Sequence, residues 1–289
     1  ADYLLEKTKY EIIGVSRSQE KKSMYLPYKK KKPSRLKFHQ MDLNLDADRL
    51  LDLLDEVRPA VVINFSALSE VEPSWRHPVD YYRTNVLAII RLADALQGRG
   101  YLKRFVQISS PEVLGTCRGA AEDAPLAPTT PYAASKAAAD LYLLALARRT
   151  KFPVVLVRST NVFGRHQQLH KIIPRSVICL KLGRKITLHN GGKAVKSFIH
   201  IRDVSDGELR VCRDAVPGGI YHLSPDGEGI PVREVVARIC RLRGVDFLEA
   251  TCESQERSDQ DAAYVIDSSK ARRTLGWKPR VGFEEGLRD

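Results

Sequence analysis

One pair of side chains in this 289-residue chain has the types and spacing needed for proton transfer. Tyr132 and Lys136 are four residues apart in an alanine-rich stretch, so on a helix they share one face. A phenol ordinarily has a pKa of about 10, and a neighbouring ammonium favours its anion. The pair therefore predicts a general base, Tyr132, whose pKa Lys136 lowers toward neutral pH.

A hydroxyl and a carboxylate follow an apolar run further upstream. Residues 104–109 predict a buried strand, and Ser110 and Glu112 come directly after it. Ligands of open α/β sheets bind at the carboxyl ends of the strands, so these side chains would face the same ligand as Tyr132. Two structural alternatives to these functional roles stay open. Tyr132 and Lys136 could be ordinary side chains on the surface of a helix, and Glu112 could only cap a turn.

Strand-like and helix-like segments alternate along the first half of the chain. Apolar runs bounded by turn residues predict buried strands at 11–15, 60–65, 104–109 and 154–158. Helical periodicity covers residues 46–57, 82–96 and 131–149. This alternation predicts an α/β fold with a Rossmann-like, doubly wound parallel sheet and helices on both faces.

After residue 164 the predicted elements become shorter. We expect a helix near 172–182, a strand pair at 186–189 and 197–200, and a helix at 232–243. The pattern predicts a dinucleotide-binding domain over 1–164 and a smaller, mainly substrate-binding lobe over 165–289, with some segments returning to the first domain. Because the chain has no Gly-rich phosphate-binding turn, we expect the first strand and that turn to precede Ala1, so that the first domain is N-terminally truncated.

Several motifs resemble those of the extended short-chain dehydrogenases, the NAD-dependent epimerase/dehydratase family. Ser-Ser-x-Glu-Val-x-Gly at 109–115, followed by Pro-Tyr-x-x-Ser-Lys at 131–136, is most similar to nucleotide-sugar 4,6-dehydratases. Arg-x-x-Asn-x-Phe-Gly at 158–164 and Lys-Ser-Phe-Ile-His at 196–200 extend the resemblance into the second half of the chain. It covers nearly the whole sequence.

The resemblance implies an enzyme that oxidises a nucleotide-diphosphate sugar transiently at C4 with a nicotinamide cofactor. Tyr132 with Lys136 would take the 4-hydroxyl proton, Ser110 would hydrogen-bond the same oxygen, and Glu112 would remove the C5 proton. In dehydratases an Asp normally precedes this Glu, but here the position is Pro111. Two alternatives therefore remain: an epimerase or decarboxylase of the same family, and a non-catalytic NAD(P)-binding sensor.

The resemblance also assigns binding residues. Those expected at the cofactor are Arg17, Asp42, Asn64, Ser66, Ala67, Asn85, Tyr132 and Lys136. Those expected at the substrate are Ser110, Asn161, Lys171, Lys193, Lys196 and Arg257. An arginine near the end of the second strand can accommodate a 2′-phosphate, so Arg17 slightly favours NADP over NAD. Leu114 and Glu70 replace the family's usual Tyr and His, which predicts a changed sugar or reaction.

The composition narrows the expected partners. No window approaches the roughly 18 apolar residues that span a bilayer, and five scattered cysteines argue against a disulfide framework or a metal site, so we expect a soluble, cytoplasmic protein with no membrane contact. The formal charge of +12 comes partly from the lysines at 29–32, which we interpret as a solvated loop and not as a nucleic-acid site. The expected partners are a nucleotide sugar and, by analogy, a second copy in a homodimer.

Overall fold

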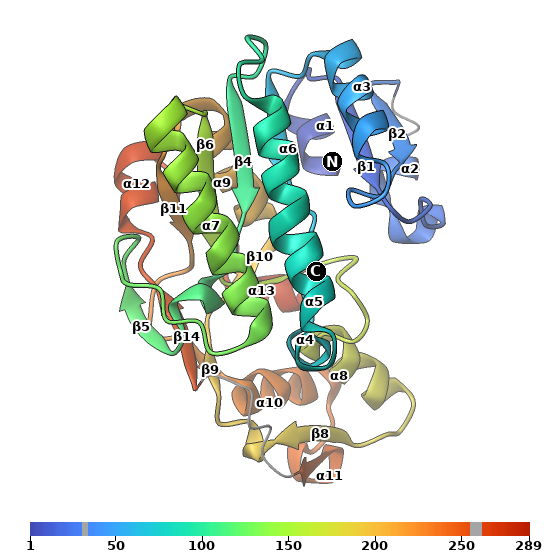
Figure 1. Cartoon of the computed structure of the whole chain (residues 1–289). Helices are drawn as coiled ribbons and strands as arrows, with labels where there is room; N and C mark the ends of the chain where they lie inside the picture. Colours follow the sequence, from blue (N-terminus) through green and yellow to red (C-terminus); the bar gives the residue numbers. More distant parts are fainter. Residues whose placement is uncertain (31–33, 255–261) are drawn as a thin grey trace.

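A four-stranded parallel sheet forms the centre of the computed structural model, which describes residues 1–30, 34–254 and 262–289 (Figure 1). The strand order is β11 (Ile220–Leu223), β6 (Val154–Ser159), β4 (Arg104–Ile108) and β3 (Val61–Asn64). Helices α6 (Ala88–Leu96) and α7 (Pro131–Thr150) lie on one face, and α9 (Ile201–Asp214) and α12 (Ser269–Leu275) lie on the other. The predicted doubly wound α/β fold is confirmed.

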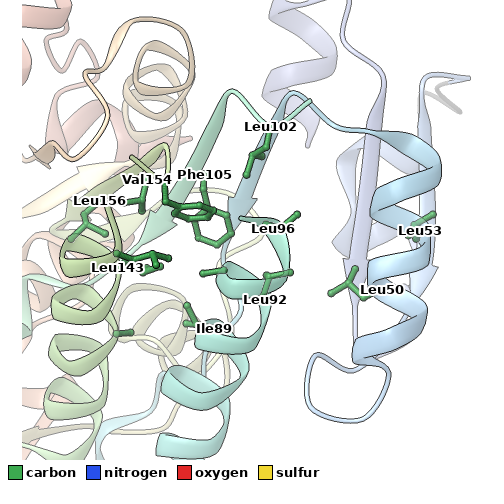
Figure 2. Close-up of a cluster of buried hydrophobic side chains, with 14 of the residues drawn as sticks. Leu50, Leu53, Ile89, Leu92, Leu96, Leu102, Phe105, Leu143, Val154 and Leu156 are labelled. Atoms are coloured by element: carbon green, nitrogen blue, oxygen red, sulfur yellow. The ribbon is translucent and has the colours of Figure 1, made fainter. Parts of the chain in front are cut away.

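Alternate residues of the central strands enter two different hydrophobic cores. Phe105, Val154 and Leu156 pack against Ile89, Leu92 and Leu143 of α6 and α7 (Figure 2). Val106, Val155 and Val157 pack against the helices of the opposite face. Because both faces are covered, most side chains of these strands are apolar, which explains the hydrophobic runs in the sequence; buried polar residues such as Gln107 and Arg158 occur toward the carboxyl ends.

The first two strands form a separate parallel pair. β1 (Ile12–Ser16) aligns Ile12 with Leu36 of β2 (Leu36–Gln40), and α1 (Asp2–Lys7) and α2 (Pro27–Lys30) lie nearby. Helix α3 (Ala47–Val57) directs Leu50 and Leu53 into the α6 core (Figure 2). Within the described ranges β1 and β3 are not hydrogen-bonded to each other, so the expected strands lie in two sheets. The lysine run is helical as far as Lys30, and its last two lysines, Lys31 and Lys32, lie outside the described residues.

The second half of the chain contributes a smaller lobe, drawn at the foot of Figure 1. It contains α8 (Ile172–Lys181), β8 (Ile186–His189), α10 (Val232–Arg243), α11 (Phe247–Ala250) and β13 (Thr251–Ser254). β8 pairs in parallel with β13, whereas β10 (Phe198–His200) pairs with β7 (Asn161–Phe163). The expected pairing of 186–189 with 197–200 is therefore wrong, because the buried side chains of the two strands belong to different cores.

The remaining elements connect these parts. A mixed sheet has the order β12 (Ile230–Pro231), β9 (Val195–Lys196), β14 (Ala263–Ile266) and β5 (Cys117–Ala120). Three short helices are α4 (Val71–Arg76), α5 (Pro78–Tyr82) and α13 (Phe283–Arg288). None of the helices in the described ranges is both long and apolar enough to cross a membrane. All five cysteines are free thiols.

The helix expected at 82–96 contains one wide turn. Between α5 and α6, residues Arg83–Leu87 form a π-helix. A π-turn holds one more residue than an α-turn and often occurs at functional sites. Here it contains Asn85, which the sequence assigns to the cofactor site.

Candidate active site

The first turn of α7 holds Tyr132 at a fixed place. Thr130 precedes the helix, and its hydroxyl accepts a hydrogen bond from the Ala133 amide at 3.1 Å. Pro131 occupies the first helical position, where its missing N–H costs no hydrogen bond. The cap therefore sets the start of the helix one residue before Tyr132.

The turn after β4 holds Ser110 and Glu112. Residues Pro111–Leu114 form a 3₁₀ turn, η3, and the Ser110 hydroxyl accepts a hydrogen bond from the Glu112 amide at 3.2 Å. The turn ends at Gly115, whose φ of 65° favours glycine and where an added Cβ would lie 2.4 Å from the Ala127 carbonyl oxygen. Pro111 thus has a structural role in the position where dehydratases carry an acid.

Tyr132 meets Ser110 and Glu112 at this point. The phenol is hydrogen-bonded to the Ser110 side chain, and its ring packs edge-on against Tyr81 with 6.4 Å between centroids. Burial raises the pKa of Tyr132, the negative charge of Glu112 raises it further, and the Ser110 hydrogen bond opposes both. The Glu112 carboxylate and the Ser110 hydroxyl therefore both influence the charge state of the Tyr132 phenol.

Lys136 does not act on Tyr132 as the sequence predicts. Its ammonium donates a hydrogen bond of 2.6 Å to the Ile108 carbonyl oxygen at the end of β4. Burial lowers the pKa of Lys136 to about 8, while the charge of Asp140 opposes this shift. The expected lowering of the Tyr132 pKa toward neutrality by Lys136 is not found in this structure, because burial and the charge of Glu112 raise that pKa.

A pocket of about 450 Å³ opens where these elements meet. Five predicted site residues line it: Ser110, Glu112, Tyr132, Asn161 and Lys171. They come from η3, α7, β7 and the segment before α8, so the fold brings together residues up to 61 positions apart. Their convergence supports the motif assignments.

Other predicted substrate residues lie elsewhere. Lys193 is exposed and is not part of the pocket lining. Lys196 is half-buried, with its ammonium 5.4 Å from the ring centroid of Tyr264, which does line the pocket. Arg257 lies outside the described residues.

The pocket also contains residues that the sequence analysis missed. They include Ser69, Thr160, His166, Gln167, Gln168 and Tyr264. Thr160 lies within the recognised motif at 158–164 and His166 lies two residues after it, so both could have been found by their proximity to its matched residues. Tyr264 arrives from β14, and nothing in its local sequence marks it. No cluster of three metal-ligating side chains occurs in the ranges that the structure describes.

Glu70, noted as a departure from the family pattern, forms an ionic cluster at the edge of the pocket. One carboxylate oxygen lies 3.0 Å from His170 Nε2 and 3.2 Å from Lys171 Nζ. Burial acts to raise the pKa of Glu70, but the Lys171 ammonium and His170 hold it below its usual value. The Lys171 ammonium is therefore partly neutralised by its ion pair with Glu70.

Two predicted cofactor residues hold the loop after β3. Asn64 donates to Gln107 Oε1 at 2.8 Å and accepts from the Ser66 amide at 3.1 Å. Asn85 is fully buried; its oxygen accepts from the Leu68 amide and its nitrogen donates to the Leu68 carbonyl and to Ser135 Oγ. Both amides therefore bind the protein itself and fix residues 65–68.

The other predicted cofactor residues lie near the carboxyl ends of the first strands. Arg17 and Ser66 are exposed, and Asp42 and Ala67 are half-buried. Asp42 accepts a hydrogen bond from the Asn44 amide at 2.8 Å. These four side chains follow β1, β2 and β3, the edge at which open α/β sheets bind ligands.

Comparison with known proteins identifies the family. The family model described as GDP-mannose 4,6 dehydratase matches residues 1–289. The chain belongs to the GDP-mannose 4,6-dehydratase family. The predicted resemblance to extended short-chain dehydrogenases of the nucleotide-sugar 4,6-dehydratase branch is confirmed.

Several nucleotide-sugar 4,6-dehydratases are similar to this chain over most of its length. The dTDP-D-glucose 4,6-dehydratase of Mus musculus is 32% identical over 259 residues, which cover 87% of this chain and 72% of the relative. The dTDP-glucose 4,6-dehydratase of Streptomyces venezuelae, solved with NAD bound, has a TM-score of 0.89 and 29% identity, covering 98% of this chain and 86% of that one. The Bacillus anthracis enzyme, in complex with NAD, has a TM-score of 0.89 and 26% identity, covering 99% and 89%.

Proposed function

We propose that this chain is a nucleotide-diphosphate-sugar 4,6-dehydratase in which Tyr132 is the general base for oxidation at sugar C4. The single observation that carries the proposal is the convergence of Tyr132, Ser110 and Glu112 on one pocket. A phenol, a hydroxyl bonded to it and a nearby carboxylate are the groups that oxidation and subsequent C5 deprotonation require.

Each of the three side chains has a distinct task. Tyr132 accepts the proton of the 4-hydroxyl, and Ser110 hydrogen-bonds the same oxygen as negative charge develops on it. The 4-keto group then acidifies the C5 hydrogen, which Glu112 removes. Glu112 suits this task because its turn is fixed by the Ser110 cap and by Pro111.

The donor set fits a nicotinamide dinucleotide. Lys136 donates one hydrogen bond to the Ile108 carbonyl oxygen, and an ammonium has three protons to donate. Arg17 follows β1, Phe65 and Ser66 follow β3, and all three side chains are exposed; these residue types suit phosphates, flat rings and ribose hydroxyls. When bound, the oxidised nicotinamide would supply a hydride acceptor and a positive charge that favours the phenolate.

Arg17 predicts a preference for NADP over NAD. If its guanidinium pairs with a 2′-phosphate, the substitution Arg17→Ala should weaken NADPH binding by about tenfold or more and leave NADH binding unchanged. Fluorescence titration of both reduced cofactors measures this, with Arg58→Ala as the matched loss of an exposed arginine elsewhere. Equal weakening of both cofactors would contradict a 2′-phosphate contact.

Pro111 is the observation that favours a second function. Without an acid beside Glu112, expulsion of the 6-hydroxyl needs another proton donor, and the chain would otherwise stop at epimerisation or decarboxylation. The pocket offers His166 and Lys171 as further titratable groups. A non-catalytic sensor is less well supported, since sensing needs neither the phenol nor the hydroxyl bonded to it.

A product assay tests the proposed function. We expect the chain, incubated with NAD or NADP and a panel of dTDP-, UDP- and GDP-sugars, to convert one of them to a 4-keto product that has lost one water, detected by mass spectrometry. A product of unchanged mass and altered stereochemistry would establish the epimerase alternative. Cofactor binding with no turnover of any sugar would establish the sensor.

The proposal extends to partner and location. We infer a homodimer, supported by exposed apolar side chains on the neighbouring α5, π-turn and α7, namely Val79, Tyr82, Leu87 and Leu141. We infer a cytoplasmic setting from five thiols that form no disulfide. Sedimentation of the purified chain tests the first.

A further inference from the structure

A buried group of charges lies directly behind the catalytic side chains. Asp140 is one helical turn beyond Lys136 on α7, and Arg158 comes from the neighbouring strand β6. Asp140 is fully buried, and its Oδ2 lies 3.2 Å from an Arg158 guanidinium nitrogen that is itself 1% exposed. Charges are seldom placed so deep without a partner, and here each group has one, although Asp140 Oδ1 and Arg158 Nε and Nη1 are buried without a hydrogen bond to any of the described residues.

The same carboxylate oxygen also contacts the strand that carries the catalytic serine. Ser109 donates a hydrogen bond of 2.7 Å to Asp140 Oδ2, and Ser110 is the next residue. Lys136, from the same helix face as Asp140, donates to the Ile108 carbonyl one residue earlier. The last residue of β4, Ile108, and the residue after it, Ser109, are thus tied to two successive turns of α7.

We propose that Asp140 is a positioning residue for the reaction: its carboxylate joins α7 to the end of β4 through Ser109 and places a negative charge one helical turn from the Lys136 ammonium. This inference rests on the proposed function for its kinetic consequence, but its electrostatic part does not. Asp140 acts through Lys136 and Ser109, and it does not line the substrate pocket.

The charges around Lys136 make the direction of the effect definite. Burial lowers the pKa of Lys136, and Asp140 is the charge that opposes burial. Around this cluster, Glu112 on η3, Tyr81 on α5 and Asp140 itself act on the pKa of Tyr132, and Arg158 on β6 acts on Asp140 and on His222 of β11. Burial raises the pKa of Asp140, and the charge of Arg158, the Ser109 hydrogen bond and Lys136 oppose that rise.

An ordinary stability role is the competing explanation. Buried ion pairs often contribute little net stability, although loss of one partner is destabilising. If Asp140 has only a structural role, its substitution would lower the melting temperature but would leave the titration midpoint of Lys136 unchanged. The titration therefore separates the two explanations.

The decisive experiment measures Lys136 in the full-length chain. NMR of ¹⁵N-lysine-labelled protein, with the signal assigned by loss in Lys136→Arg, should give a midpoint that falls by about one pH unit or more in Asp140→Asn. Asp140→Glu should restore it, and Asp94→Asn, which removes an exposed carboxylate of α6, should not move it. An unmoved midpoint in Asp140→Asn would overturn the proposal.

A second variant and a kinetic measurement complete the test. If Asp140→Asn does not fold because Arg158 is left unpaired, the double variant Asp140→Asn with Arg158→Met removes both charges and is titrated instead. In the kinetic arm, the alkaline limb of kcat for the converted nucleotide sugar should move to lower pH in Asp140→Asn. If the wild-type chain converts no sugar, the proposed function fails, and the NMR midpoint still decides the role of Asp140.

Discussion

Replacing Tyr132 by Phe is expected to lower kcat for the converted nucleotide sugar by about 10³-fold. The variant loses one oxygen, the group that accepts the 4-hydroxyl proton, while the ring keeps its edge contact with Tyr81. Stopped-flow absorbance of the reduced nicotinamide would measure the loss at the oxidation step. Cofactor affinity and melting temperature should change little.

Tyr81→Phe is the matched control for this prediction. Its phenol donates to the Glu70 carbonyl oxygen and takes no part in the reaction, so its removal should cost far less turnover. Full turnover by Tyr132→Phe, or equal losses in the two variants, would be incompatible with Tyr132 as the base.

The substitution Glu112→Gln is expected to separate oxidation from dehydration. Loss of the C5 base should lower formation of the dehydrated product by about 10²- to 10⁴-fold, while oxidation at C4 continues. The negative charge of Glu112 raises the pKa of Tyr132, so its removal should lower that pKa. The acidic limb of the oxidation step should therefore move to lower pH.

Two measurements test this second prediction. Solvent deuterium incorporation at C5 should stop in Glu112→Gln, and cofactor reduction should persist. As a control, Glu122→Gln changes another partly buried carboxylate, one that accepts a hydrogen bond from the His222 amide outside the pocket. Unchanged dehydration by Glu112→Gln would show that the C5 base is a different group.

The sequence alone allows the fold class and the catalytic side chains of the pocket to be predicted. Buried parallel strands need mainly apolar side chains on both faces, so β4 and β6 stand out as apolar runs. Ser110, Glu112 and Tyr132 follow a strand or begin a helix, and such positions meet at one edge of the sheet. Local pattern and topology together therefore place them in one site.

Long-range contacts account for what the sequence does not predict. The spacing of Tyr132 and Lys136 indicates a shared helix face, but it does not indicate that the ammonium bonds the Ile108 carbonyl. Likewise, alternating apolar residues mark β8 as a strand without naming β13 as its partner. The burial that raises the pKa of Tyr132 depends on packing by several elements at once.

The dependence on long-range contacts also explains why the sequence does not predict the roles of Asn64 and Asn85. Asn64 and Asn85 match the family motif, and the motif alone does not distinguish direct ligand contact from support of a loop. In the structure both side chains bind backbone or side-chain groups of the protein. Contacts between residues 17 positions apart, such as Asn85 with Leu68, depend on the packed fold.

The wide turn at Arg83–Leu87 determines where this region can vary in length. Because the turn holds one residue more than an α-turn, deletion of one residue within it would restore a regular α-helix and keep the downstream residues in phase. Within α6, by contrast, each residue advances the next by about 100°, so a deletion ahead of Leu92 would turn that side chain out of the core. A deletion in the wide turn would therefore spare the packing of α6 and disturb the bonds between Asn85 and Leu68.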